Sequence, residues 1–257
     1  DRRKKEEKGN TIASRTYQLQ LAEVTKLSVM LKGLPLYLGL CLNYFYLIHG
    51  GGRWGEFPKE NYFSAVIKTL PCLGLTFLTW RNDVTNDSHK RLKNNVTLGL
   101  FFSVLGDVCM VWRFDRVLQG MFFFAIAHLF YARAFRFKPL GDATTAVTCL
   151  VPGLLLFVIM VLPNIPETSV KVCGLLYSTI ISMMWWRCVV YFKSTKKTTM
   201  VRACVGAVVF MTSDFLICID TWVMPLPYAS LIIMITYYTA QFLIASSVLE
   251  YRAVKND

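Results

Sequence analysis

The chain has 257 residues, of which 54% are apolar and 17% charged, and its mean hydropathy is +0.43. A soluble domain carries about 45–50% apolar and about 25% charged residues, so the composition excludes an ordinary soluble protein and favours a membrane protein. The net charge of +12 does not indicate a nucleic-acid partner, because the basic residues lie between apolar runs rather than along one face.

Residues 1–32 form a basic segment ahead of the first apolar run. Five of its first eight residues are cations, which suit anionic lipid headgroups but equally suit a solvated tail. Apolar residues recur at near-helical spacing over 11–31, which predicts a helix lying in the membrane interface. The segment has no compact apolar stretch that ends in a small-residue cleavage site, so we expect no cleavable signal peptide.

Eight apolar runs follow, and their lengths are close to the roughly 20 residues that cross a bilayer. The connectors between them are short and several carry Gly or Pro, so no soluble domain fits between the runs. We therefore predict an all-α integral membrane protein with one eight-span domain over 33–250 and a short cytosolic tail over 251–257. The predicted spans are 33–49, 61–80, 94–112, 117–135, 143–162, 168–192, 200–219 and 226–249.

The distribution of Lys and Arg predicts the orientation of these spans. With the N-terminus in the cytosol, the inner segments hold 21 Lys and Arg residues and the outer connectors hold five. Cytosolic segments are enriched in Lys and Arg, so we expect both termini to be cytosolic. The sequons at Asn86 and Asn95 then fall near an inner connector, and we expect neither to be glycosylated.

The eight cysteines lie almost entirely inside the apolar runs, and none forms a C-x-x-C pair. This pattern predicts neither a zinc site nor a disulfide framework, and the cysteines are interpreted as small apolar residues.

The two halves of the chain resemble each other. A glycine precedes an aspartate by eight residues in the third span, Gly99 to Asp107, and again in the seventh, Gly206 to Asp214. The spans that follow carry Ala-His at 127–128 and Ala-Gln at 240–241. This offset of four spans predicts two parallel four-helix repeats that bring the two aspartates together at matching depth. Chance similarity between apolar helices is the alternative.

Few ionisable side chains lie within the predicted spans. An Asp or Lys at the centre of a span costs about 2.5–3.5 kcal/mol on insertion scales, so it usually faces a partner or a wet cavity. Four of them are expected at a similar depth and therefore in one site: Lys68, Asp107, His128 and Asp214. A structural Lys–Asp ion pair, with the histidine bonded to a backbone carbonyl, is the alternative.

The chain has no G-x-S-x-G elbow and no H-E-x-x-H motif, so the carboxylate pair remains as the candidate chemistry. Two carboxyl groups in a site of low dielectric do not both ionise easily, so one is expected to keep a proton. A general acid and a carboxylate together can cleave acetal-like C–O bonds through an oxocarbenium ion.

Five motifs, in order along the spans, resemble the lysoplasmalogenase (YhhN-like) family of membrane proteins, and the resemblance covers about 33–250. The segments 135–140 and 225–228 are similar to its animal branch in particular. The motifs lie at Ile67–Pro71, Val104–Asp107, Gly120–Tyr131, Gly206–Asp214 and Thr236–Gln241.

The resemblance implies an enzyme that hydrolyses the vinyl ether bond of lysoplasmalogens, giving a fatty aldehyde and glycerophosphocholine or glycerophosphoethanolamine. It also implies an endoplasmic reticulum membrane protein, with a lysophospholipid substrate and no metal or other cofactor. Vinyl ether hydrolysis needs a proton donor at carbon and a carboxylate that stabilises the cation, which matches the chemistry expected of the aspartate pair.

Asp107 and Asp214 are thus the predicted catalytic residues, with their individual roles left open. A lipid or proton-coupled transporter that uses the same carboxylates, or a lipid-binding protein that has lost catalysis, remain as alternatives. The predicted substrate-orienting residues are Lys68, His128, Tyr131, Tyr177, Ser213, Tyr237, Tyr238 and Gln241.

Overall fold

The computed structural model describes residues 33–53, 55–84 and 86–249, and these residues form helices and connectors without a β-strand. The prediction of an all-α membrane protein is thereby confirmed. The predicted basic segment over 1–32, its interfacial helix and the tail over 251–257 lie outside the described residues.

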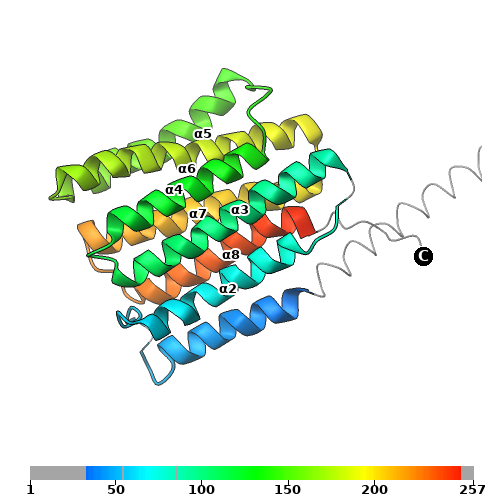
Figure 1. The fold of residues 1–257 in the computed structure, drawn as a ribbon. Helices are drawn as coiled ribbons and strands as arrows, with labels where there is room; N and C mark the ends of the chain where they lie inside the picture. Colours follow the sequence, from blue (N-terminus) through cyan, green and yellow to red (C-terminus); the bar gives the residue numbers. More distant parts are fainter. Residues whose placement is uncertain (1–32, 54, 85, 250–257) are drawn as a thin grey trace, which may run out of the picture.

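Eight helices cover the eight predicted spans (Figure 1). Seven of them are long and apolar enough to cross a membrane, while the first has 17 described residues. The helices are 33–49, α2 (Tyr62–Trp80), α3 (Asp87–Cys109, continued by the 3₁₀ turn Met110–Trp112), α4 (Val117–Ala134), α5 (Ala143–Leu156, continued by the π turn Phe157–Val161 and the 3₁₀ turn Leu162–Asn164), α6 (Thr168–Thr195), α7 (Thr198–Cys218, continued by the π turn Ile219–Val223) and α8 (Ala229–Leu249).

Helix α3 begins at Asp87, well before the predicted start at 94. The side chain of Asn86 accepts a hydrogen bond from the Ser88 N–H at 2.9 Å and caps the helix there. Hydropathy marks where a helix enters the hydrocarbon, whereas a cap marks where the helix itself begins, so the polar first turns of α3 escaped the prediction.

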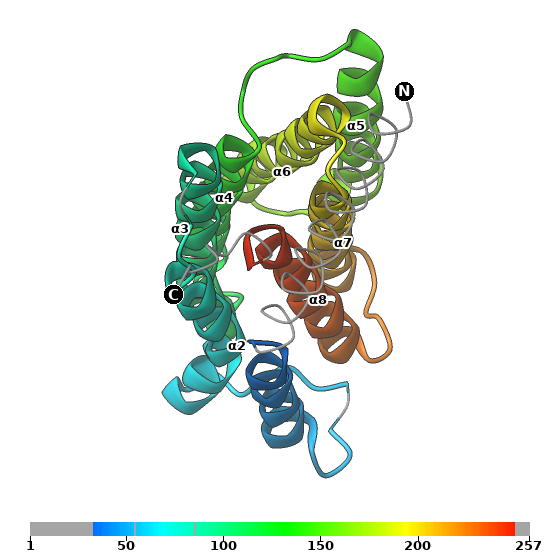
Figure 2. The same ribbon diagram turned by 90° about the vertical axis from the view of Figure 1, so that its right-hand side faces the viewer.

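The helices lie side by side in one bundle, and α8 is enclosed by its neighbours while α5 lies at the edge (Figure 2). The packing repeats after four spans. Helix α3 packs on α4 as α7 packs on α8, α2 packs on α3 as α6 packs on α7, and α4 packs on α6 as α8 packs on α2. This pattern agrees with the predicted parallel repeat.

Glycines at matching positions allow the closest helix pairs to approach. A Cβ atom on Gly99 of α3 would lie 2.2 Å from the ring of Tyr131 on α4. A Cβ atom on Gly206 of α7 would lie 3.0 Å from the backbone oxygen of Ala240 on α8. Both positions therefore require the absence of a side chain, which is how membrane helices commonly pack closely.

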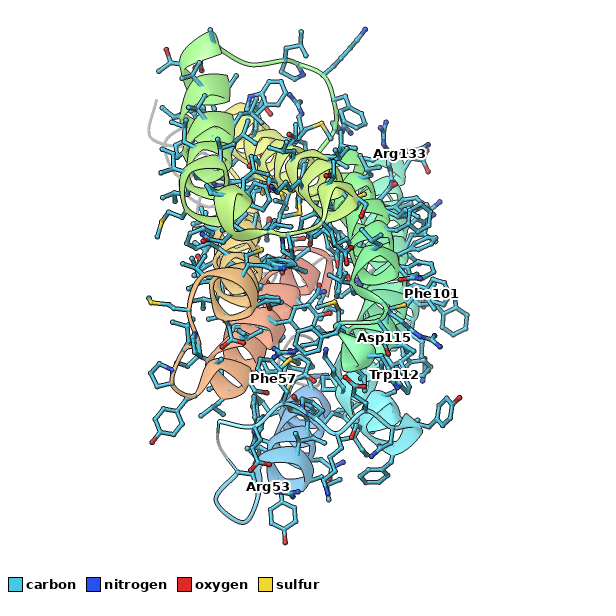
Figure 3. All side chains as sticks on the ribbon, turned by 90° about the vertical axis from the view of Figure 1, so that its left-hand side faces the viewer. Arg53, Phe57, Phe101, Trp112, Asp115 and Arg133 are labelled. Carbon is cyan, nitrogen blue, oxygen red and sulfur yellow. The ribbon has the colours of Figure 1, made fainter. Side chains whose placement is uncertain are left out.

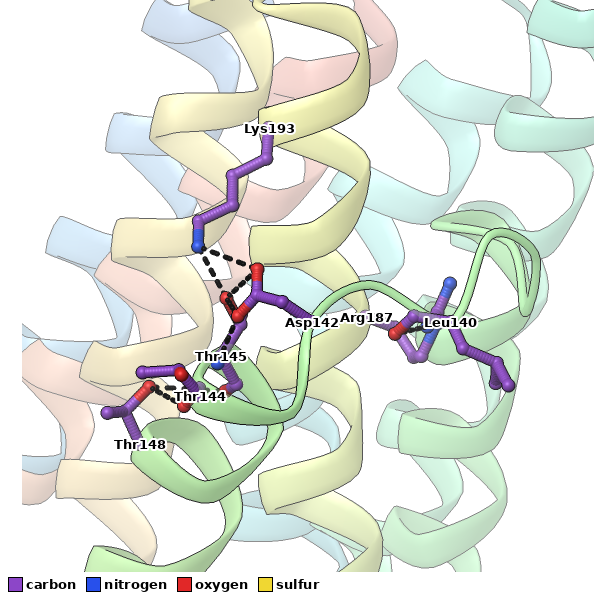
Figure 4. A network of polar contacts seen from close by, with 7 residues as sticks. All are labelled: Leu140, Asp142, Thr144, Thr145, Thr148, Arg187 and Lys193. Atoms are coloured by element: carbon purple, nitrogen blue, oxygen red, sulfur yellow. Dashed lines mark hydrogen bonds and ion pairs between the residues drawn. The ribbon is translucent and has the colours of Figure 1, made fainter.

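The connector between α4 and α5 is fixed by two polar clusters (Figure 4). Buried Arg187 of α6 donates to the carbonyl oxygens of Arg136 and Pro139, each at 2.7 Å, and to that of Leu140 at 3.3 Å. This buried cation is therefore satisfied by backbone carbonyls and holds the connector in place.

Asp142 closes the same connector as the N-cap of α5. It accepts hydrogen bonds from the hydroxyl and the N–H of Thr145, each at 2.6 Å, and pairs with Lys193 at 3.3 Å (Figure 4). The Thr145 donors, followed by Lys193, hold the pKa of Asp142 below its usual range, so α5 keeps an ionised cap at neutral pH.

Replacing Gly99 by Ala is expected to lower the thermal unfolding midpoint of the detergent-solubilised protein, because the buried ring of Tyr131 has to move. Overpacking of this kind costs about 1–3 kcal/mol. Gly39→Ala is the matched control: no atom lies within 4 Å of a Cβ there, so its midpoint should stay the same or rise. Equal midpoints for the two variants would contradict the close α3–α4 approach.

Candidate functional site

One cavity of about 500 Å³ lies inside the bundle and is lined mainly by apolar side chains. Its deep part contains three of the four ionisable residues that the sequence predicted to share a site, Lys68, Asp107 and Asp214. The lining continues to exposed Glu60 and Phe114, so the cavity reaches the end of the bundle where the connectors 50–61 and 113–116 lie. Figure 3 looks onto this end, with Phe57 near its centre.

Asp107 is buried, and donors face both of its carboxyl oxygens. The ammonium of Lys68, on α2, lies 3.9 Å from Oδ1, and the hydroxyl of Tyr237, on α8, donates to Oδ2 at 2.7 Å. An ammonium and a phenol together provide the compensation that a carboxylate needs inside an apolar bundle.

A second layer of side chains holds Tyr237 in place. Gln241 donates to the Tyr237 oxygen at 3.2 Å and accepts a hydrogen bond from Tyr131 at 2.7 Å. The thiol of Cys72 also donates to the Tyr237 oxygen, at 3.4 Å. From its place in an apolar run, Cys72 was predicted to be only a small apolar residue. The missed signal was its position four residues after Lys68, which places both side chains on one face of α2.

Asp214 has a different set of partners. Tyr177, on α6, donates a short hydrogen bond to Asp214 Oδ2, and His128 Nε2, on α4, lies 2.9 Å from the same phenol oxygen. His128 Nε2 is also 3.8 Å from Asp214 Oδ2. The ring of Phe210 packs edge to face against the imidazole, with 4.7 Å between the ring centroids. His128 is fully buried behind Tyr177, so it orients Tyr177 rather than lining the cavity.

The repeat is visible in these contacts. Each aspartate is met by a side chain from the preceding helix of its own half, Lys68 for Asp107 and Tyr177 for Asp214. Each is also approached from the last helix of the other half, by Tyr237 on α8 or His128 on α4. The surroundings differ in charge, because a lysine lies beside one carboxyl group and a tyrosine beside the other.

Two predicted site residues direct their hydroxyl groups to the backbone. Ser213 lines the cavity, but its hydroxyl donates to the carbonyl of Ile233 at 3.1 Å. Tyr238 donates to the carbonyl of Lys68 at 2.8 Å and lies outside the cavity. Both hydroxyl groups therefore connect α8 to its neighbours instead of pointing at the cavity.

The rest of the lining is mainly apolar and comes from α4, α5, α6, α7 and α8 and from the turn that ends α3. Leu156 of α5 and Val208 of α7 line the cavity and are 48% and 40% exposed. The cavity thus combines a deep part with ionisable groups, a mainly apolar wall and an end at the connectors. Within the described residues, no three His, Cys, Asp or Glu side chains gather as a metal site requires.

This fold and site define a class: a polytopic α-helical membrane protein with two carboxyl groups in an intramembrane cavity. Residues 63–248 match the YhhN family, and the chain belongs to that family, which confirms the resemblance seen in the sequence.

Curated relatives agree with this assignment over most of the chain. Lysoplasmalogenase TMEM86A of Bos taurus is 34% identical over 239 residues, covering 88% of this chain and 92% of the relative. Lysoplasmalogenase TMEM86B of Homo sapiens is 34% identical over 224 residues, covering 87% and 88%. Human lysoplasmalogenase TMEM86A is 30% identical over 234 residues, covering 86% and 90%. No solved structure matches the chain significantly.

Replacing Lys68 by Met is expected to destabilise the protein strongly, because it leaves Asp107 without its cation. Breaking a buried pair costs about 3–5 kcal/mol. The double variant Lys68→Met with Asp107→Asn should recover most of that loss, since no charge is then left unpaired. The coupling energy comes from the unfolding free energies, in mixed detergent, of the wild type, the two single variants Lys68→Met and Asp107→Asn, and the double variant. Additive effects of the two substitutions would show that the two groups do not interact.

Proposed function

We propose that this chain is a lysoplasmalogenase, which hydrolyses the vinyl ether bond of lysoplasmalogens to a fatty aldehyde and a glycerophosphocholine or glycerophosphoethanolamine. The observation that carries the proposal is the presence of both aspartates in a single, mainly apolar cavity. The names of the curated relatives support the same activity.

The cavity suits a lipid with one hydrocarbon chain. Its volume of about 500 Å³ falls within the range of small-molecule sites, about 300–1,000 Å³. The apolar residues that α5 and α7 contribute to the lining, including Leu156 and Val208, offer the chain an apolar surface. The vinyl ether then lies beside the carboxyl groups, and the headgroup lies toward the connectors.

The two carboxyl groups take different roles in this proposal. Both oxygens of Asp107 face donors, Lys68 and Tyr237, so this group acts as the carboxylate. Asp214 receives its donor, Tyr177, on Oδ2, and no donor in the described part of the chain occupies Oδ1. Oδ1 of Asp214 is therefore free to carry the proton that the reaction needs.

The reaction begins when Asp214 transfers its proton to the alkenyl carbon remote from the ether oxygen. The resulting oxocarbenium ion is stabilised by the Asp107 carboxylate, which also accepts a proton from the water that attacks the carbon bonded to oxygen. The hemiacetal then collapses to the aldehyde, and its hydroxyl proton passes to the departing glycerol oxygen. Return of the proton from Asp107 to Asp214 restores the starting state.

The location is part of the same proposal. The chain is an integral membrane protein by its apolar helices. We place it in the endoplasmic reticulum on its similarity to the YhhN family, and we place both termini in the cytosol on the Lys and Arg distribution. The end of the cavity at 113–116 then faces the lumen.

Purified wild-type protein in detergent is expected to release fatty aldehyde from a lysoplasmalogen, and Asp107→Asn and Asp214→Asn are each expected to lose about 100- to 10,000-fold in rate, because each removes an acid–base group. Aldehyde is measured by coupled reduction. The saturated alkyl ether analogue is the negative substrate. A cooperative thermal unfolding transition shows that each variant is folded, with a lower midpoint expected for Asp107→Asn because Lys68 loses its partner.

Activity retained by one folded variant would assign that aspartate a structural role. Wild-type protein that binds the lipid without releasing aldehyde would refute the enzyme, and lipid uptake into proteoliposomes would then identify a transporter.

The orientation is tested by cysteine labelling in sealed microsomes. Lys138→Cys, in the connector before α5, should react with a membrane-impermeant maleimide added from the cytosolic side. Arg53→Cys, in the connector before α2, should react only after the membrane is permeabilised. Both native side chains are exposed, so neither substitution disturbs a buried contact. The reverse labelling pattern would invert the topology.

A further inference from the structure

Arg113 occupies the end of the cavity, in the connector between α3 and α4. Its side chain lines the cavity and is 21% exposed, whereas its sequence position predicts only a charge in an outer connector. The guanidinium carbon lies 3.7 Å from the ring centroid of Phe57 and 4.7 Å from that of Phe114. A guanidinium stacked between aromatic rings is held in a defined plane.

A carboxylate from the other half of the molecule fixes this guanidinium further. Asp220, in the turn after α7, pairs through Oδ2 with Arg113 Nη1 at 3.2 Å. Its Oδ1 accepts the N–H of Leu226 at 3.0 Å, so the carboxylate is itself anchored to the backbone. In the described part of the chain, Nη1 is the only nitrogen of Arg113 with a hydrogen-bond partner. The guanidinium therefore keeps donors available for an anion.

The spacing along α3 matches the structure of a lysophospholipid. Arg113 follows Asp107 by six residues, which corresponds to about 9 Å along the helix. In a lysoplasmalogen, a glycerol unit separates the vinyl ether from the phosphate, so a vinyl ether at Asp107 places the phosphate toward the end of the cavity. The other cation that lines the cavity, Lys68, is paired with Asp107.

We infer that Arg113 binds the phosphate group of the lipid and thereby sets the depth at which the vinyl ether stops. This inference rests on the proposed function. Arginine suits this role because its planar donors match phosphate oxygens and because Asp220 neutralises only part of its donor set. Glu60 also lines this end of the cavity and is the carboxylate available to the ammonium of a choline or ethanolamine headgroup.

The test compares a lysoplasmalogen with an alkenylglycerol, which has the same vinyl ether but no phosphate. For wild-type protein, KM should be lower for the lysoplasmalogen by about 10- to 100-fold, the effect of one or two charge-assisted hydrogen bonds. Arg113→Gln should remove this difference by raising KM for the lysoplasmalogen alone, with kcat nearly unchanged. Arg113→Lys should restore part of it.

Arg116→Gln is the matched control, because it removes the same charge from the same connector at an exposed residue outside the cavity. It should leave both KM values unchanged. A wild-type protein that does not distinguish the two substrates would overturn the phosphate site. So would an Arg113→Gln variant that loses activity equally toward both, since that result identifies a structural role for the ion pair with Asp220.

Binding measurements separate this inference from the proposed function. The saturated ether lysophospholipid and the corresponding alkylglycerol are not substrates, so their affinities for wild-type and Arg113→Gln protein report on the phosphate site even if no aldehyde is formed. Competition by glycerophosphocholine, but not by inorganic phosphate at the same concentration, would assign the site to a lipid headgroup. Competition by both would assign it to phosphate in general and overturn lipid recognition.

Discussion

Lys68 and Asp107 meet inside a bundle whose other side chains are mainly apolar, and much of the surrounding structure serves to hold this pair. Tyr237 donates to the second oxygen of the carboxylate, and Gln241 in turn donates to Tyr237. Removing one member leaves a charge or a donor in a medium that cannot solvate it. The close packing of α3, α4 and α8 follows, because the network reaches from α2 across α8 to Tyr131 on α4.

The four-span repeat explains how two carboxyl groups come to share one cavity. Asp107 and Asp214 lie on equivalent helices with equivalent neighbours. The repeated helix packing therefore brings both carboxyl groups into the same cavity. Divergence at a few positions then makes the halves unequal. Lys68 next to one carboxyl group and Tyr177 next to the other provide two distinct environments, which is the condition for an acid and a base to act together.

The cavity has three parts that differ in chemistry. The deep part carries the carboxyl groups, the side formed by α5 is apolar, and the end at the connectors carries Arg113 and Glu60. An amphipathic lipid with one chain, a polar headgroup and a reactive bond between them presents the same three parts. The weak packing of α5 at the bundle edge also places the apolar wall next to the bilayer from which such a lipid comes.

The sequence alone determined the eight apolar helices, and it singled out Lys68, Asp107 and Asp214, which the structure brings into one cavity. Length and hydropathy decide which segments cross a bilayer, and an ionisable residue within such a segment is conspicuous because burial is costly. Only the tertiary structure decided that Asp107 pairs with Lys68 and Tyr237 while Asp214 is met by Tyr177. It also decided that Cys72 contacts Tyr237 and that Arg113 lines the cavity. Only the structure shows that the hydroxyl groups of Ser213 and Tyr238 donate to backbone carbonyls. Hydropathy gives the depth of a residue, but its partner depends on helix rotation and neighbours, which are set by packing between segments distant in sequence.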